Sequence, residues 1–196
     1  MKKMLAILGS PRENGNISKM LDCVVISAKD AGWQVDIVNL YEQNIAWCKG
    51  CGACQKSGIC VINDDIGPIR QTLIACDVVA LAAPTYFANV PGPVKNMFDR
   101  LVGAVMDDRG FVPKPRLRKT QQYLLLTACN TPFPFNRLAR QSTGATRAMK
   151  EFFHIAGMKK LGQVVFAGSR NKTELPPAIR KKIARICAFP IKRAKG

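Results

Sequence analysis

The sequence lacks the residues that several common enzyme classes require. It has one histidine, His154, so metal-dependent hydrolysis and Ser-His or Cys-His catalysis are without their usual groups. No apolar run approaches the ~18 residues of a membrane span. The apolar stretch at residues 4–8 is also shorter than the ~7 residues of a signal-peptide core. We therefore expect a cytoplasmic protein with no membrane segment, in which His154 is structural or on the surface.

Two nucleotide-binding fingerprints are also missing. The chain contains no G-x-x-x-x-G-K-[ST], so hydrolysis of a magnesium nucleotide is not expected, and no G-x-G-x-x-G, so the usual dinucleotide turn is absent. Internal repeats and low-complexity tracts are absent as well. A chain of 196 residues without such features fits one domain that buries roughly two thirds of its unfolded surface.

Acidic residues are scarce in the second half of the chain. Residues 1–108 carry 10 Lys and Arg against 11 Asp and Glu, whereas residues 109–196 carry 20 against 2, and the net charge is +17. This basic half suits an acidic partner (a phosphate, a nucleotide, an acidic protein or a nucleic acid) or simply a solvated surface. No nucleic-acid-binding motif accompanies the charge, so a nucleic-acid-binding or regulatory module is only a remote alternative.

Apolar stretches of strand length alternate with helical patterns along the whole chain. We predict strands at residues 4–8, 35–40, 77–83, 122–128 and 162–168. We predict helices at residues 17–31, 66–75, 94–106, 137–156 and 176–187, and a basic loop at residues 109–120. This alternation indicates one doubly wound α/β domain, residues 1–196, with a parallel sheet covered on both faces. Such sheets bind ligands beyond the carboxyl ends of their strands.

The turn after the first predicted strand has the composition of an anion site. Residues 9–18 read GSPRENGNIS and lead into a helix, whose free N–H groups and dipole favour a negative charge. The residues expected at a bound phosphate are Ser10, Arg12, Asn14, Asn16, Ile17 and Ser18. In the alternative interpretation, Asn16 or Ser18 only caps the helix.

The loop after the third predicted strand displays aromatic and amide groups at the same edge of the sheet. Aromatic rings and backbone amides supply the stacking area and directed hydrogen bonds that a flat heterocycle needs. The expected ring-binding residues are Pro84, Thr85, Tyr86, Phe87 and Asn89. In the alternative interpretation, Tyr86 and Phe87 only cover the sheet edge.

Four of the eight cysteines are concentrated in one short segment. Cys48, Cys51, Cys54 and Cys60 are spaced C-x2-C-x2-C-x5-C with glycines between them, which lets the backbone turn sharply around a [4Fe–4S] cluster. Zinc usually takes two separated C-x2-C pairs and is less natural here. Free or reversibly paired thiols are the third interpretation. The other four cysteines lie in apolar segments and are expected in the core: Cys23, Cys76, Cys129 and Cys187.

These segments resemble those of the iron–sulfur flavoprotein and NADPH-dependent FMN reductase group. Residues 9–18 resemble its GSPRxxGNT phosphate loop, although Ile17 replaces the usual Thr, and residues 84–91 resemble its P-x-Y-F-x-N-x-P loop for the isoalloxazine ring. The cysteine spacing resembles the group's compact cluster motif. The resemblance implies a flavodoxin-like fold with a five-stranded sheet of order 2-1-3-4-5 and a cysteine-rich loop after the second strand.

The resemblance also implies a function. It indicates an FMN-dependent oxidoreductase that passes electrons between a [4Fe–4S] cluster and FMN, with a cluster-free NAD(P)H-dependent FMN or quinone reductase as the alternative. Implied partners are NAD(P)H as a donor, an acidic redox protein such as ferredoxin, and further copies of the chain in a dimer or tetramer. The cysteine loop and residues 109–120 are the expected subunit contacts. No catalytic side chain is predicted, and Asp64 and Asp65 are expected to cap the helix that follows them.

Overall fold

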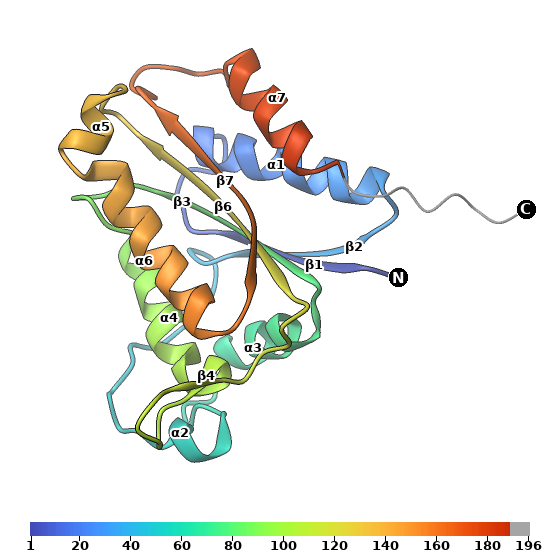
Figure 1. Ribbon diagram of the computed structural model, residues 1–196, viewed down its shortest axis with the longest axis vertical. Helices are drawn as coiled ribbons and strands as arrows, with labels where there is room; N and C mark the ends of the chain where they lie inside the picture. Colours follow the sequence, from blue (N-terminus) through green and yellow to red (C-terminus); the bar gives the residue numbers. More distant parts are fainter. Residues whose placement is uncertain (189–196) are drawn as a thin grey trace, which may run out of the picture.

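A computed structural model describes residues 1–188, so residues 189–196 of the predicted domain lie outside the described residues. Five parallel strands form one sheet in the order β2-β1-β3-β6-β7 (Figure 1). Their bounds are β1 Lys3–Leu8, β2 Gln34–Asn39, β3 Val78–Pro84, β6 Gln122–Cys129 and β7 Lys159–Ala167. This order confirms the predicted flavodoxin-like topology.

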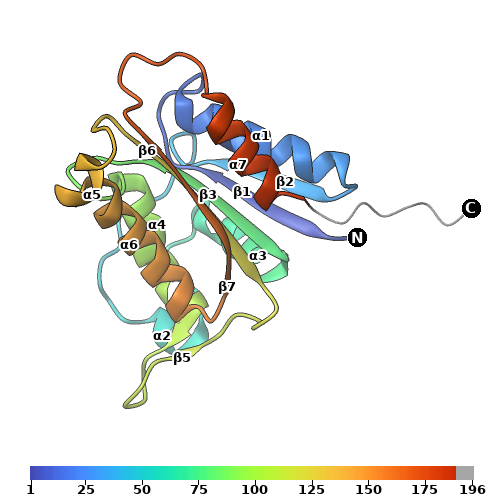
Figure 2. The ribbon, with the colours of Figure 1, turned by 45° about the horizontal axis from the view of Figure 1, so that its top comes forward.

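Helices cover both faces of the sheet. The helices are α1 Asn16–Asp30, α2 Cys54–Ser57, α3 Ile66–Ala75, α4 Gly92–Val105, α5 Phe135–Leu138, α6 Gln141–Ile155 and α7 Pro177–Ile186. Figure 2 shows α1 and α7 side by side on one face and α3, α4 and α6 on the other. Within residues 1–188, no helix is long and apolar enough to span a membrane.

The core follows from the apolar patterns of the sequence. The run Val78–Ala83 in β3 is at most 2% exposed, as a strand buried on both faces should be. On α1, the buried apolar residues recur at the spacing of one helical face: Ile17, Met20, Leu21, Val24, Val25 and Ala28. Of the four scattered cysteines, Cys76, Cys129 and Cys187 are buried, while Cys23 is partly buried against the core.

Two predicted elements differ from the structure. The predicted helix at residues 137–156 is wrong at its start, because Arg140 has a φ of +54° and a left-handed residue cannot continue a right-handed helix. The stretch therefore divides into α5 and α6, joined by a buried hydrogen bond from Asn136 Nδ2 to Ser142 Oγ of 2.8 Å. The predicted basic loop includes part of a short antiparallel ribbon, β4 Met106–Asp107 with β5 Lys114–Pro115.

Candidate functional site

A cleft of about 780 Å³ lies at the carboxyl ends of β1, β3, β6 and β7. The turn after β1 and the start of α1 contribute Ser10, Arg12, Asn14, Asn16 and Ile17, and the loop after β3 contributes Pro84, Thr85 and Tyr86. Eight of the eleven residues predicted to bind a cofactor are thus brought together around one space. Ser18, Phe87 and Asn89 do not line it.

The start of α1 leaves its backbone donors available to a ligand. Gly15 is the N-cap residue, and no side chain accepts a cap hydrogen bond there, so the alternative in which Asn16 or Ser18 caps the helix is wrong. Asn16 Nδ2 instead donates to the carbonyl oxygen of Lys172 at 2.8 Å, and Ser18 lies on the buried face of α1. The turn itself is held by the Arg12 N–H, which donates to Ser10 Oγ at 3.3 Å.

The loop after β3 makes a tight two-residue turn beside the cleft. The N–H groups of Tyr86 and Asn89 each donate to the other residue's carbonyl oxygen at 2.9 Å, and Phe87 and Ala88 between them have φ values of +48° and +60°. Two positive φ values define a type I′ turn, which glycine or asparagine normally occupies. The turn is therefore strained, and it leaves the Phe87 side chain fully exposed at the rim.

Helix α6 supports this turn through an unusually close contact. A Cβ atom added at Gly144 would lie 1.9 Å from the carbonyl oxygen of Ala88. Only glycine at position 144 allows the helix to approach the turn so closely. The base of the same loop is fixed by Thr85, whose N–H donates to the Ala128 carbonyl oxygen at 3.0 Å and whose hydroxyl lies 3.2 Å from the Thr127 hydroxyl.

One wall of the cleft, the loop after β7, was not predicted from the sequence. Residues 169–173 line it and bring the basic side chains of Arg170 and Lys172, and Lys19 of α1 adds a third. The Lys19 ammonium donates to the Thr173 carbonyl oxygen and so ties α1 to this loop. The sequence could have predicted this wall, because the loop follows the carboxyl end of the last parallel strand, where such sheets bind ligands.

The four clustered cysteines line a second, smaller pocket of about 150 Å³. Their segment runs along α4 and includes the short helix α2 (Figure 1). Gly50, Gly52 and Gly58 have φ values between +63° and +72°, which confirms the sharp turns expected between the cysteines. Across residues 1–188, no group of three or more His, Cys, Asp and Glu side chains is arranged to hold a metal ion.

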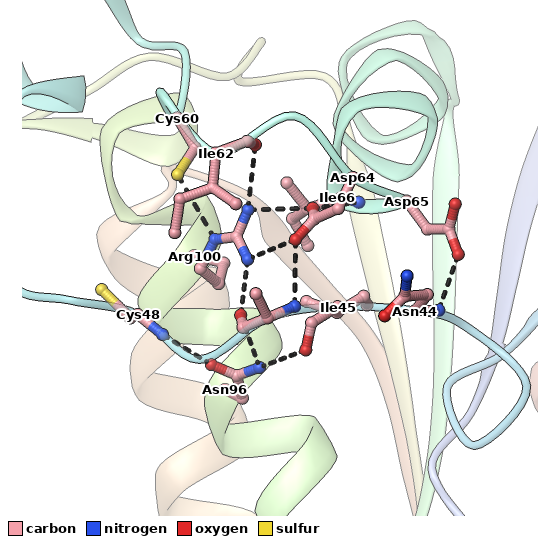
Figure 3. Close-up of polar contacts among 11 residues, drawn as sticks. Asn44, Ile45, Cys48, Cys60, Ile62, Asp64, Asp65, Ile66, Asn96 and Arg100 are labelled. Carbon is pink, nitrogen blue, oxygen red and sulfur yellow. Dashed lines mark hydrogen bonds and ion pairs between the residues drawn. The ribbon is translucent and has the colours of Figure 1, made fainter.

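Helix α4 holds this segment through two side chains one turn apart (Figure 3). Asn96 accepts a hydrogen bond from the Cys48 N–H at 3.1 Å, and its amide donates to the Ala46 carbonyl oxygen at 3.3 Å. Arg100 pairs with both carboxylate oxygens of Asp64, at 2.8 and 2.9 Å. Because α4 begins directly after the loop that lines the larger cleft, one helix connects the two sites.

Residues 2–120 match the family model described as NADPH-dependent FMN reductase. The match covers more than half of the chain. The chain belongs to this family. The cleft residues contributed after β1 and β3, and all four clustered cysteines, lie within the matched residues.

Curated relatives of this FMN reductase family member are described as iron-sulfur flavoproteins. One from Archaeoglobus fulgidus is 39% identical over 100 residues, which cover 51% of this chain and 46% of the relative. One from Methanosarcina thermophila is 39% identical over 100 residues, with coverages of 51% and 52%. The chain therefore spans about half the length of these curated relatives.

Solved structures extend the similarity of this reductase family member to the whole fold. An FMN-dependent NADH-azoreductase from Bacillus anthracis in complex with FMN has a TM-score of 0.75 at 15% identity, covering 95% of this chain and 98% of its own. An NAD(P)H:quinone oxidoreductase from Methanothermobacter marburgensis has a TM-score of 0.69 at 14% identity, with coverages of 95% and 95%. At these identities the likeness establishes the fold alone.

The Arg100–Asp64 ion pair is expected to stabilise this reductase family member in a pH-dependent way. Burial disfavours the charged carboxylate of Asp64, but hydrogen bonds from Arg100 and from the N–H groups of Ala46 and Ile66 outweigh it and lower its pKa below 3.8. Asp64 accepts the Ile66 N–H at the start of α3, but the N-cap residue Asp65 makes no side-chain cap bond and accepts the Asn44 N–H instead, so the predicted capping by Asp65 is wrong. Breaking a buried pair typically costs about 3–5 kcal/mol, so Asp64→Asn should lower the free energy of unfolding by about 3 kcal/mol at pH 7.

The pH dependence follows from the direction of the shift. A lowered pKa in the folded state adds stability that is fully present above 3.8 and is lost as the pH falls through the folded-state value. In denaturant unfolding, the free energy of unfolding of wild type should therefore exceed that of Asp64→Asn by a constant amount from pH 7 to about 5. This difference should become smaller below pH 3.8. The control is Asp65→Asn, at a partly buried neighbour that accepts the Asn44 N–H but forms no ion pair in the described structure, and it should cost under ~1 kcal/mol. A difference in free energy of unfolding that grows as the pH falls would contradict the lowered pKa of Asp64.

Proposed function

We propose that this chain is an FMN-dependent oxidoreductase that moves electrons through FMN bound in the larger cleft. The observation that carries the proposal is the convergence of two loops at the carboxyl ends of neighbouring strands: an uncapped helix start and an aromatic-bearing turn. FMN has a phosphate and a flat ring, and the two loops offer the complementary chemistry. The match to the FMN reductase family supports the same assignment.

The residues around the helix start would bind the phosphate. The N–H groups that open α1 are donors for its oxygens, and Ser10 and Asn14 lie beside them in the cleft. Arg12 and Arg170 approach from two different loops and supply positive charge. Charge-assisted hydrogen bonds of this kind are about twice as strong as neutral ones.

The loop after β3 would orient the ring. Pro84, Thr85 and Tyr86 line the cleft, and the strained turn beyond them holds their backbone in place. Phe87 and Asn89 act outside the cleft: Asn89 closes the turn, and Phe87 is free to cover a bound ring from the rim. When bound, FMN supplies hydride and single-electron chemistry, and a [4Fe–4S] centre would supply single-electron transfer.

We propose that Cys48, Cys51, Cys54 and Cys60 would hold a [4Fe–4S] centre. The four thiolates of such a centre bind four different iron atoms, so they surround a volume rather than converge on one point. All four of these cysteines line one pocket. The curated relatives' description as iron-sulfur flavoproteins supports the cluster. The alternative remains a cluster-free NAD(P)H-dependent FMN or quinone reductase.

A double change of Arg12 and Arg170 to Gln tests the proposed phosphate site. Each arginine would make a charge-assisted bond worth about 1.5–3 kcal/mol, so the dissociation constant of FMN should rise at least tenfold. Riboflavin has the same ring without the phosphate, and its affinity should stay unchanged. Fluorescence titration of both ligands measures the two constants.

The matched control is Arg147→Gln, which removes one exposed arginine of α6 that does not line the cleft. It should leave both ligands' affinities as in wild type. If the double variant binds FMN within a factor of two of wild type, or loses riboflavin equally, the phosphate lies elsewhere.

Electron donors and protein partners are part of the same proposal. NAD(P)H is the proposed small-molecule donor, because the family model is described as NADPH-dependent. An acidic redox protein such as ferredoxin would suit the basic residues that pack beside the cysteines. Arg116, in residues 109–120, donates to the carbonyl oxygen of Gln55 in α2 at 2.6 Å, and Lys49 lines the cysteine pocket. Opposite charges would speed the encounter of two such proteins.

A homo-oligomer, a dimer or a tetramer, completes the proposal. Large apolar side chains are exposed on the cysteine segment and at the tip of the β4–β5 ribbon, including Trp47 at 69%, Val61 at 66% and Phe111 at 105%. Several exposed apolar groups in neighbouring segments are typical of an interface. Sedimentation at micromolar concentration should therefore give a dimer or larger species, and a single monomeric species would contradict it.

A further inference from the structure

Arg100 is the most completely buried charge near the cysteine pocket, with a side chain that is 0% exposed. Its guanidinium donates hydrogen bonds to groups on both sides of the cysteine segment (Figure 3). It donates to the carbonyl oxygens of Ala46, two residues before Cys48, and of Ile62, two residues after Cys60. It also lines the pocket itself.

One donor of Arg100 is directed at a sulfur atom. The Nε–H group donates to Cys60 Sγ at 3.3 Å, while the two terminal nitrogens face the carboxylate of Asp64. The ion pair thus lies with its positive end toward the sulfur and its negative end away from it. Water does not reach the guanidinium, so the effect of this charge on the sulfur is weakly screened.

We propose that Arg100 is a positioning residue of the cysteine pocket that fixes Cys60 and favours the reduced form of a [4Fe–4S] centre bound there. The inference rests on the proposed cluster. Adding an electron makes such a centre more negative, and a cation that donates to one of its ligand sulfurs stabilises the added charge. The carboxylate of Asp64 orients the arginine and partly offsets its charge.

The two members of the ion pair should therefore shift the midpoint potential in opposite directions. Arg100→Gln removes the cation and should make reduction about tenfold less favourable, a shift of 59 mV to lower potential for one electron. Asp64→Asn removes the opposing charge and should move the potential the other way. A purely structural role would not produce opposite signs.

The experiment is an anaerobic redox titration of the full chain reconstituted with iron and sulfide, followed by the absorbance and electron paramagnetic resonance of the centre. Arg116→Gln is the matched control, because Arg116 also anchors the cysteine segment through Gln55 and Gly103 but donates to no cysteine sulfur in the described structure. Arg116→Gln should change the equilibrium constant for reduction of the centre less than threefold. The iron content and the FMN potential, measured in each variant, report the integrity of both sites.

Each outcome decides the inference. A lower potential in Arg100→Gln, a higher one in Asp64→Asn and little change in Arg116→Gln support it. An equilibrium constant for reduction of the centre in Arg100→Gln that is within twofold of wild type overturns it. Potential shifts of the same sign in Arg100→Gln and Asp64→Asn also overturn it. If Arg100→Gln holds no iron, Arg100→Lys, which keeps the charge, takes its place beside Asp64→Asn. Midpoint potentials that are equally lower than wild type in Arg100→Lys and Asp64→Asn overturn the inference.

Failure of the proposed cluster has a different signature. Wild-type chain that binds FMN but takes up no iron and sulfide overturns the cluster and this inference together. Wild-type chain with a full centre whose potential is unaffected by Arg100→Gln overturns the inference alone.

Discussion

Replacing Cys54 with Ser is expected to abolish the broad visible absorbance of a reconstituted iron–sulfur centre while FMN remains bound. Cys54 opens α2 and lines the pocket with the other three cysteines, and a serine hydroxyl, which is much harder to deprotonate than a thiol, is a far poorer iron ligand. The two sites have no lining residue in common, so the cleft should keep its affinity for FMN. Iron analysis and the released flavin measure the two effects.

The same variant separates two routes of electron delivery. Reduction by a one-electron protein donor should slow by far more than reduction by a chemical hydride donor, because hydride reaches the flavin without the cysteine pocket. The control is Cys23→Ser, at a partly buried cysteine of α1 on the other face of the sheet. It should change neither rate. Equal slowing of both routes in Cys54→Ser would mean that the cluster is structural.

Replacing Gly144 with Ala is expected to weaken FMN binding roughly 5- to 150-fold without unfolding the chain. The new Cβ would lie 1.9 Å from the Ala88 carbonyl oxygen, so the already strained turn of residues 86–89 has to move. Overpacking of this kind costs about 1–3 kcal/mol. Alanine is the better helix former by ~1 kcal/mol, which offsets part of the loss in the free energy of unfolding.

Gly67→Ala in α3 is the matched control for this change. It makes the same substitution in a helix, but nothing lies within 4 Å of the added Cβ. Its FMN affinity should equal that of wild type, and its stability should be equal or higher. If Gly144→Ala binds FMN as tightly as Gly67→Ala, the turn does not position the flavin.

Much of the fold could be predicted from the chain because its signals are local. The apolar run of β3 and the one-sided pattern of α1 each specify an element without reference to the rest of the molecule. The placement of cofactor-binding residues after β1 and β3 followed from a rule about parallel sheets. These residues meet in one cleft, as expected for adjacent parallel strands.

Features that depend on distant contacts could not be predicted. The break at Arg140 depends on how α5 and α6 pack, and the helical pattern of the sequence runs through it. The role of Gly144 depends on Ala88, which lies far away along the chain. Arg100 looked like an ordinary helix residue, and only the fold brings it to Asp64 and Cys60. The loop after β7 was missed although the sheet rule applied to it.

Titration of the purified chain with FMN, riboflavin and FAD is the most direct test of the account. The cleft offers an anion site beside a ring site, and the chain has no G-x-G-x-x-G turn for an adenosine half. We expect one FMN per chain, bound more tightly than either riboflavin or FAD, and mass spectrometry of any flavin released from the purified protein should identify FMN. A chain that binds no flavin, or that releases FAD and prefers it in the titration, would contradict the account.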